Sequence, residues 1–376
     1  MRTLALSDPL LGFVFHNRRA KLSAALFGHV GVLESYFAGD LDVDDLAGAF
    51  AAAIGAGADR SNALVRLRNR WHEWRFSNAS PKQARRNARF HYGLDEAFYR
   101  LWLDEPLMMY TCAYWKDGTR SIDEAQRDKV EHVCRKLRIA PGDRVVDIGC
   151  GFGGFMFHAQ SEHGARVTGV NTTPEQVAAV RQEIARRHLE SSLDVIESDF
   201  REVSGEYDKV VSIGVLEHAG RDQLDEVVRA HAASLKPGGL GMLHFIGHVS
   251  PEETEFFIRK HVFPGGWIPA LADVLVAMER AGLEVLDVEN FRRHYALTLD
   301  AWVERFDRNW PRIHALDPRR FDERFRRVWR AYLYGCAELF RSPGGKTHLF
   351  QIVFSRGNVT AAGYPMTRDF IYETNA

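Results

Sequence analysis

The chain has 376 residues, enough to bury a large core, and its hydrophobic content of 45% is ordinary for a soluble globular protein. Its formal net charge of −1 excludes a whole-protein field that would attract nucleic acid or a strongly charged substrate, so a charged partner has to meet a local patch. The four cysteines lack Cys-x-x-Cys spacing, so we expect no disulfide framework and no metal. No stretch has the length and apolarity needed to cross a bilayer, and we predict a cytoplasmic location.

Residues 1–85 are predicted to form a helical N-terminal domain. From Thr3 to Asn78, alanine, leucine and phenylalanine recur at helical intervals, and runs of β-branched residues are few. Residues 86–120 follow as a connecting segment that includes FHYGLDEAFYRLWLD, and we expect this segment to act as a lid over the site described below. Strand patterns begin only after this point.

The end of the N-terminal domain, from Arg66 to Phe90, is strongly basic and aromatic, with eight basic residues against one acid, Glu73. The basic residues are Arg66, Arg68, Arg70, Arg75, Lys82, Arg85, Arg86 and Arg89, and the aromatic ones are Trp71, Trp74, Phe76 and Phe90. A solvated helix face followed by a linker would explain the charge. The interleaved aromatic residues instead favour an anionic membrane surface, where each basic side chain contributes about 1 kcal/mol. Single-stranded nucleic acid would be bound by similar chemistry.

Residues 121–376 alternate between helix and strand patterns. Ser121 to Leu137 is predicted to be a helix, with Ser121 as its N-cap and Glu124 three residues further on. The strand candidates are Arg144–Ile148, Arg166–Val170, Asp194–Ile196, Lys209–Ile213, Gly241–Ile246, Glu284–Val288 and Leu349–Ser355. Seven strands with helical spacers predict an α/β fold with a doubly wound sheet. Two insertions, at about 249–282 and 297–342, are expected to cover the carboxyl edge of that sheet.

A glycine-rich turn follows the first of these strands, in VVDIGCGFGG. Its Gly-x-Gly-x-x-Gly spacing fits NAD, FAD or S-adenosylmethionine, because glycines let the backbone approach a ligand at a helix N-terminus. A dinucleotide site should have an acid at the end of the second strand, where this chain has Asn171. Asp147 before the first glycine and LKPGG before the fifth strand are typical of S-adenosylmethionine methyltransferases. These features favour S-adenosylmethionine over NAD.

Polar and aromatic residues follow five successive strands, and the carboxyl ends of parallel strands meet at one edge of a sheet. These residues are Gly149 and Gly151, Asn171 to Gln176, Asp199 and Phe200, Glu217 and His218, and His244 and Ile246. A carboxylate and an aromatic ring after the third strand suit an adenine. Some of these residues also have an ordinary structural explanation: Asp199 can cap a helix, Glu217 can interact with a helix dipole, and His244 can be a core histidine. Cys112, in YTCAYW, can likewise be an inert packing residue.

Eight motifs in consistent order, from about Phe90 to Gly357, resemble the cyclopropane fatty acid synthases, including the mycolic acid cyclopropane synthases. The motifs are HYGLDEAFYRLWLD, YTCAYW, DIGCGFGG, SIGVLEHAG, LKPGG, VFPGGWIPA, HYALTLDAW and QIVFSRG. The helical start is similar to the N-terminal domain of bacterial synthases that act on phospholipid acyl chains. The resemblance implies a class I methyltransferase fold, Rossmann-like, with a seven-stranded sheet.

The resemblance also implies two bound groups. It implies S-adenosylmethionine held by Tyr110, Thr111, Gly149, Gly151, Asn171, Thr172, Gln176, Asp199 and Phe200. It implies a bicarbonate ion held by Glu217, His244 and Tyr295 with backbone groups of Cys112 and Ile246. Cys112 is then a positioning residue rather than a nucleophile.

This chemistry suits an unsaturated lipid. Attack of a cis double bond on the sulfonium methyl gives a methylated carbocation that has to be shielded from water, and bicarbonate can remove the proton in an apolar tunnel. Phe245, Phe263 and Trp267 are candidates to line this channel, although an ordinary place in the core is expected more often for any one of them. The expected partners are an unsaturated phospholipid acyl chain and the anionic inner face of a membrane, to which the protein binds peripherally. No nucleic acid is expected, and a homodimer is left open.

Departures from the family pattern leave alternatives. The family shows HYDLGN where this chain has HYGLDE, and a Thr or Ser often stands near Asn171. The product is therefore left open between a ring, a methyl branch and a methylene group. An N-methyltransferase of a small amine is the alternative of similar fold. An NAD-dependent oxidoreductase and a non-catalytic lipid-binding protein are the alternatives from other classes.

Overall fold

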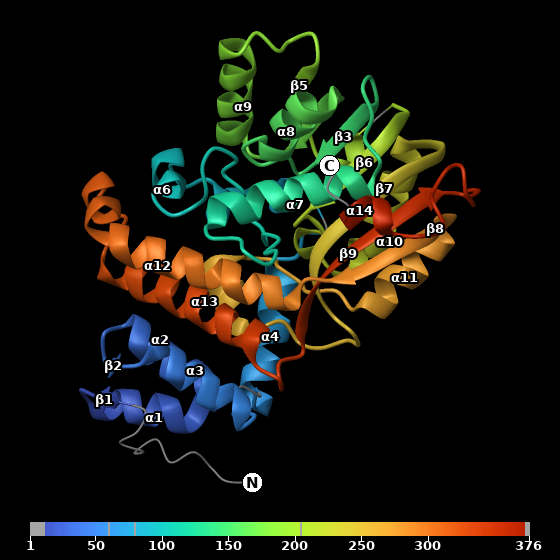
Figure 1. Ribbon diagram of the computed structural model, residues 1–376. Coiled ribbons are helices and arrows are strands. Elements are labelled where there is room, and N and C mark those ends of the chain that lie inside the picture. The colour runs from blue at the N-terminus through green and yellow to red at the C-terminus, as the bar shows by residue number, and fades with distance from the viewer. Residues whose placement is uncertain (1–11, 59–60, 79, 204, 373–376) are drawn as a thin grey trace.

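The computed structural model describes residues 12–58, 61–78, 80–203 and 205–372. A seven-stranded sheet in the strand order β5-β4-β3-β6-β7-β9-β8 forms the centre of the C-terminal part (Figure 1). Its strands are β3 (Arg144–Ile148), β4 (Arg166–Asn171), β5 (Leu193–Glu197), β6 (Tyr207–Ile213), β7 (Leu235–His248), β8 (Leu283–Asn290) and β9 (Thr347–Arg356). The predicted seven-stranded α/β fold is confirmed. β9 runs antiparallel to both of its neighbours, so the sheet is mixed.

Both faces of the sheet are covered by helices. On one face, Val145 and Val167 pack with residues of α7 (Ile122–Lys136), α8 (Gly154–His163) and α9 (Pro174–Arg186). On the other face, Val146 and Val210 pack with α10 (Leu224–Ser234) and α11 (Leu271–Arg280). Neighbouring residues of β3 thus point to opposite faces and are both fully buried, which is why this strand is a continuous apolar run.

Two long helices, α12 (Arg292–Leu316) and α13 (Glu323–Arg341), pack against each other and connect β8 to β9 (Figure 1). α13 also packs against α2 (His29–Phe37) and α3 (Leu46–Gly55) of the N-terminal part. At this contact a Cβ added to Gly335 would lie 3.0 Å from the ring of Phe50, so the glycine allows the two helices to approach closely. The aromatic-rich core that results joins the N-terminal helices to the C-terminal part.

The N-terminal part is mainly helical but also contains a small sheet. Its other helices are α1 (Arg18–Phe27), α4 (Ala63–Arg75), α5 (Pro81–Tyr92) and α6 (Glu96–Arg100). β1 (Phe13–Phe15) pairs antiparallel with β2 (Leu41–Val43), a feature absent from the predicted all-helical domain. Strands of three residues are too short to show a period of two in the sequence. The parts of that prediction at residues 1–11, 59–60 and 79 lie outside the described residues.

The segment 249–282 divides into two parts. The π-helix Ile258–Val262 packs against α4 and α13, over the carboxyl edge of the sheet. The second part contains α11, which packs against α10 and β8 as one of the sheet-covering helices, so only the first part lies where the predicted insertion was expected. The chain ends with α14 (Asp369–Tyr372), which packs against α7. No helix among the described residues is long and apolar enough to span a membrane.

Candidate active site

One pocket lies at the carboxyl ends of β3 to β6. All of the residues expected to bind the cofactor line it: Tyr110, Thr111, Gly149, Gly151, Asn171, Thr172, Gln176, Asp199 and Phe200. Met108, Asp147, Ile213 and His218 also contribute to its wall. Residues that follow four strands, as the strand-end argument predicted, and the 108–111 segment, which the resemblance implied, surround one space.

The glycine turn needs glycine for two physical reasons. Gly149 has φ +84°, and a Cβ there would lie 2.3 Å from a methyl group of Val215, so both its backbone and its surroundings exclude a side chain. Its N–H donates to the carbonyl of Val170 at 2.8 Å, which ties the turn to the end of β4. A Cβ added to Gly154, the first residue of α8, would lie 2.3 Å from the carbonyl oxygen of Leu107. The turn thus packs closely against the segment that carries Tyr110 and Thr111.

Asn171 and Asp199 both have partners within the protein. The Asn171 amide donates to Gln176 Oε1 at 2.9 Å and to the Gly151 carbonyl at 3.2 Å, so it fixes the turn. Asp199 accepts from Arg201 Nε at 2.6 Å and Nη2 at 2.9 Å, and it also caps the short helix Phe200–Glu202. Although burial raises the pKa of Asp199, these hydrogen bonds from Arg201 lower it overall. Asp199 is thus an ionised acceptor at the pocket wall, with Arg201 as its cationic partner.

A second cavity, of about 1080 Å³, adjoins the first. All five residues expected at the reaction centre line it: Cys112, Glu217, His244, Ile246 and Tyr295. Phe263 and Trp267 line it as expected, but Phe245 does not. Phe245 is fully buried beside Phe350 in the core under the sheet, so the ordinary core explanation applies to it and it does not line the channel. Alternation along β7 turns this side chain away from the cavity while its neighbours His244 and Ile246 line it.

The two cavities meet at a shared wall formed by Tyr110, Thr111, Gly214 and His218. A ligand bound in the first pocket and a ligand bound in the second cavity would therefore both contact these four residues. The second cavity continues from this wall past Leu299 and Phe340. It extends to the N-terminal residues 54–57 and Arg66.

Glu217 and His244 each place one polar atom at this site without a protein partner among the described residues. Glu217 Oε1 accepts from the backbone N–H of Ile246 at 2.6 Å, and Oε2 is buried without a hydrogen bond. Burial raises the pKa of Glu217 to about 7, against the opposing effect of the backbone hydrogen bonds. The Gln351 amide nitrogen lies 3.1 Å from His244 Nδ1, and His244 Nε2 is buried without a hydrogen bond among the described residues. With the Gln351 amide in this orientation Nδ1 accepts, and the imidazole proton is on Nε2. Burial also keeps this imidazole neutral, since it lowers the pKa of His244 well below its usual value.

Tyr295 and Cys112 complete this wall as neutral groups. Burial raises the pKa of the Tyr295 phenol and of the Cys112 thiol above their usual values. The Cys112 thiol donates to the Ala113 carbonyl at 3.2 Å. A protonated buried thiol is not a nucleophile, so the geometry agrees with a positioning role for this residue.

Sequence reasoning missed a buried lysine beneath the cofactor pocket. Lys129 of α7 is fully buried and donates to Thr111 Oγ1 at 3.1 Å. Burial lowers its pKa to about 8, and Asp104 and Asp147 nearby oppose that effect. The sequence signal was a lysine on the apolar face of an amphipathic helix. The sequence analysis predicts the helix Ser121–Leu137 but assigns no role to this lysine.

Comparisons with known proteins identify the family. The family model described as mycolic acid cyclopropane synthetase matches residues 79–352. A probable fatty acid methyltransferase of Pseudomonas putida is 39% identical over 272 residues, which cover 70% of this chain and 67% of the relative. The cyclopropane-fatty-acyl-phospholipid synthase of Escherichia coli K12 is 33% identical over 342 residues, 88% of this chain and 84% of the relative.

Solved structures agree with this assignment. The mycolic acid cyclopropane synthase CmaA1, complexed with SAH and CTAB, has a TM-score of 0.67 at 29% identity, covering 72% of this chain and 98% of that one. Coclaurine N-methyltransferase, at 19% identity and a TM-score of 0.69, shows the shared fold. The resemblance inferred from the motifs is confirmed. The chain belongs to the mycolic acid cyclopropane synthetase family and is an S-adenosylmethionine-dependent methyltransferase of the cyclopropane-fatty-acyl-phospholipid synthase type, which transfers methyl carbon to lipid.

Proposed function

We propose that the enzyme adds a methylene carbon from S-adenosylmethionine to the double bond of an unsaturated phospholipid acyl chain, giving a cyclopropane ring, with bound bicarbonate as the base. The observation that carries this proposal is the shared wall between the two cavities. There, a pocket built for a nucleotide-like ligand meets a long cavity that begins with Glu217, His244 and Tyr295. A hydride-transfer alternative with NAD has no support from the family to which the chain belongs.

The first pocket fits S-adenosylmethionine. Phe200 offers a ring face and Asp199 an ionised acceptor for an adenine, while Asn171 and Gln176 offer amide groups for a ribose. When bound, S-adenosylmethionine supplies an electrophilic methyl group. Tyr110 and Thr111 line both cavities and would orient that end of the ligand toward the second one.

The unpartnered atoms of Glu217 and His244 fit a bicarbonate ion. Buried polar atoms normally have a partner, and here one acceptor and one donor at the same wall have none among the described residues. An ionised Glu217 Oε2 would accept from the hydroxyl of bicarbonate, and the Nε2–H of His244 would donate to one of its oxygens. A bicarbonate held in this way supplies a base inside a cavity whose lipid ligand has none. Tyr295 would complete the polar wall.

The rest of the second cavity suits an acyl chain. Leu299, Leu339, Phe340, Leu349 and Trp267 give part of it an apolar lining, while charged residues such as Arg66, Glu252 and Lys346 line other parts. Such a lining excludes water from a cation that forms on the lipid, which would otherwise add water and give an alcohol. It also stabilises the bound chain by the hydrophobic effect.

The outer face of α4 supports membrane binding. Leu64, Leu67, Trp71 and Trp74 occupy one helical stripe and are between 58% and 75% exposed. The exposed Arg66, Arg70 and Arg75 flank this stripe, as in helices that lie at an anionic lipid surface. Arg66 also lines the second cavity, so the stripe adjoins an end through which a lipid chain would enter. We therefore infer a peripheral protein that takes its substrate directly from the bilayer.

Incubation with methyl-labelled S-adenosylmethionine tests the proposal. Vesicles of phospholipid with cis-unsaturated chains should gain label in the acyl chain, and mass spectrometry should show one added CH2 unit located as a ring. Vesicles with fully saturated chains are the matched control and should gain none. Label found only on an added amine, or on saturated and unsaturated vesicles alike, would overturn the proposal.

A further inference from the structure

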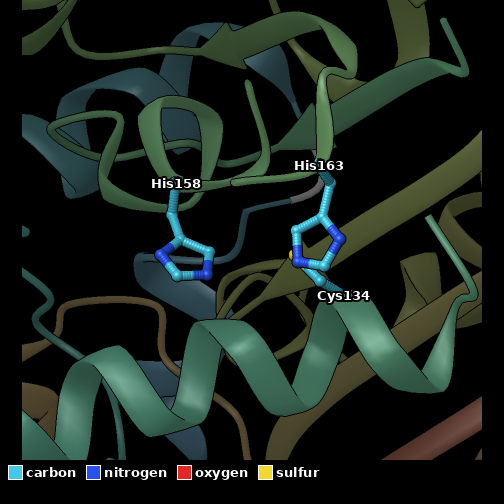
Figure 2. A group of neighbouring side chains, drawn as sticks. All are labelled: Cys134, His158 and His163. Carbon is cyan, nitrogen blue, oxygen red and sulfur yellow. The ribbon is translucent and has the colours of Figure 1, made fainter. Parts of the chain in front are cut away.

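A cluster of metal-ligand side chains lies between α7 and α8, away from both cavities. Cys134 comes from α7, and His158 and His163 come from α8 (Figure 2). The sulfur and one nitrogen of each imidazole all lie within 4.8 Å of one another. None of these residues lines the cofactor pocket or the lipid cavity, so the proposed reaction does not use them.

Glu131, one turn before Cys134 on α7, joins the two histidines. Its Oε2 lies 3.1 Å from His158 Nε2 and 2.9 Å from His163 Nε2. Its Oε1 accepts from Arg135 Nε at 2.7 Å. These three hydrogen bonds hold the carboxylate in place.

This arrangement differs from an ordinary ion pair. Two imidazoles converge on the same carboxylate oxygen, and a buried thiol stands beside them. The His158 and His163 side chains are only 13% and 19% exposed. Carboxylate, thiol and imidazole are the donor groups that zinc takes in proteins.

We propose that Glu131, Cys134, His158 and His163 form a binding site for a zinc-class divalent cation. Tetrahedral Zn²⁺ with N and O ligands at ~2.0–2.1 Å separates those ligand atoms by about 3.3 Å. Glu131 Oε2 lies 3.1 Å from His158 Nε2 and 2.9 Å from His163 Nε2, and both separations are close to that value. A Zn–S bond of ~2.3 Å places the sulfur about 3.6 Å from each nitrogen, so the 4.8 Å limit leaves about 1 Å of side-chain adjustment.

The charges also balance. Binding of the cation displaces the proton of the Cys134 thiol to solvent and shifts the proton that each imidazole Nε2 shares with Glu131 to Nδ1 of the same ring. The thiolate with the Glu131 carboxylate then neutralises the two positive charges. Arg135, on the other carboxylate oxygen, holds that ligand from the second shell. A neutral site is what a half-buried position between two helices requires.

The expected role is structural. α7 leads into β3, and α8 begins at Gly154 directly after the glycine turn, so the site joins the two helices on either side of the cofactor loop. A cation there would hold these helices together without touching the reacting groups. Sequence spacing gave no sign of it, because the residues come as Glu-x-x-Cys on one helix and as two histidines five residues apart on another.

Metal binding by the full-length protein tests the proposal. Chelator-treated protein is dialysed against Zn²⁺ and its metal content measured, affinity is measured by competition with a chromophoric chelator, and Co²⁺ is added as a spectroscopic probe. We expect one Zn²⁺ per chain and a thiolate-to-Co²⁺ charge-transfer band. Cys134→Ala and His163→Ala should each weaken Zn²⁺ binding by about 100-fold or more, and Glu131→Gln by at least about 10-fold.

His188→Asn is the matched control, since His188 is exposed, lies outside the cluster, and has a positive φ that asparagine tolerates. It should bind Zn²⁺ like the wild type. Glu131→Gln leaves the buried sulfur in place, which keeps the test valid if Cys134→Ala folds poorly by circular dichroism. The proposal would be overturned if the wild type bound no more Zn²⁺ than the Glu131→Gln and His163→Ala variants. A Co²⁺ complex without the thiolate band would also overturn it.

Discussion

The carboxylate of Glu217 and the backbone of Ile246 are joined by a hydrogen bond of 2.6 Å. This bond connects the turn after β6 to the end of β7, so two neighbouring strands fix one oxygen of a buried acid. The other oxygen is left without a protein partner among the described residues. This free oxygen is what the proposed ligand-binding role of Glu217 requires.

Replacement of Glu217 by glutamine should separate catalysis from cofactor binding. The amide keeps the size of the side chain and leaves the cofactor pocket untouched, but it cannot serve as the ionised acceptor. We expect turnover to fall by about 10²- to 10⁴-fold, the range for loss of acid–base assistance. Calorimetric titration with S-adenosylhomocysteine should give nearly the wild-type affinity. Wild-type turnover in this variant would remove Glu217 from the mechanism.

Glu217 should also reduce the stability of the ligand-free protein as the pH rises. Its pKa is raised from 4.5 to about 7 in the folded state, so the folded protein binds this proton more tightly than the unfolded chain does. The resulting stability is fully present below pH 4.5 and is lost as the pH rises through about 7. The free energy of unfolding of wild type relative to Glu217→Gln should fall by roughly 3 kcal/mol over that interval. Urea unfolding of both proteins at several pH values measures it, and a constant difference would contradict the assignment.

The exposed stripe on α4 should determine vesicle binding. Trp71 and Trp74 are 58% and 75% exposed, so replacing both by glutamate should leave the fold intact. Loss of two aromatic anchors and addition of two negative charges should weaken sedimentation with anionic vesicles by at least about tenfold. Met366, at 83% exposure, is the matched control, and Met366→Glu should bind vesicles normally. Equal binding by all three proteins would exclude α4 as the membrane-facing surface.

Lys129 should act on the cofactor through Thr111. Lys129→Met removes the hydrogen bond to Thr111 Oγ1 but keeps most of the side-chain volume. We expect a higher KM for S-adenosylmethionine in Lys129→Met and in Thr111→Val. In the double variant the loss of S-adenosylmethionine affinity should be smaller than the sum of the two single losses, with a coupling energy of about 0.5–3 kcal/mol. Strictly additive effects would show that the buried lysine supports only the fold.

The sheet and the convergence of the site were predictable because they depend on regular patterns. Apolar runs located all seven strands, and the rule that ligands bind at the carboxyl ends of parallel strands brought Gly149, Asp199 and Glu217 to one edge. Residues such as Tyr110 and Tyr295 lie outside that pattern. They were found only through the family resemblance.

Other features depend on how elements pack, which local sequence does not encode. In the sequence, Phe245 and Trp267 are equal candidates to line the channel. Strand alternation buries Phe245 in the core, whereas Trp267, in the loop after β7, lines the cavity. Asp199 was recognised as an acceptor, while its pairing with Arg201 required the geometry of a short helix. Cys134 and His163 approach each other only because α7 and α8 lie side by side.

The close fit of Gly335 against Phe50 has a mechanical consequence. α13 carries Tyr332, Cys336 and Phe340 into the lipid cavity, and its Gly335 lies directly against α3. With no space between the two helices, a displacement of α3 is transmitted to the wall around the acyl chain. If the N-terminal helices dock on a bilayer as proposed above, this contact connects that docking to the shape of the proposed acyl-chain cavity.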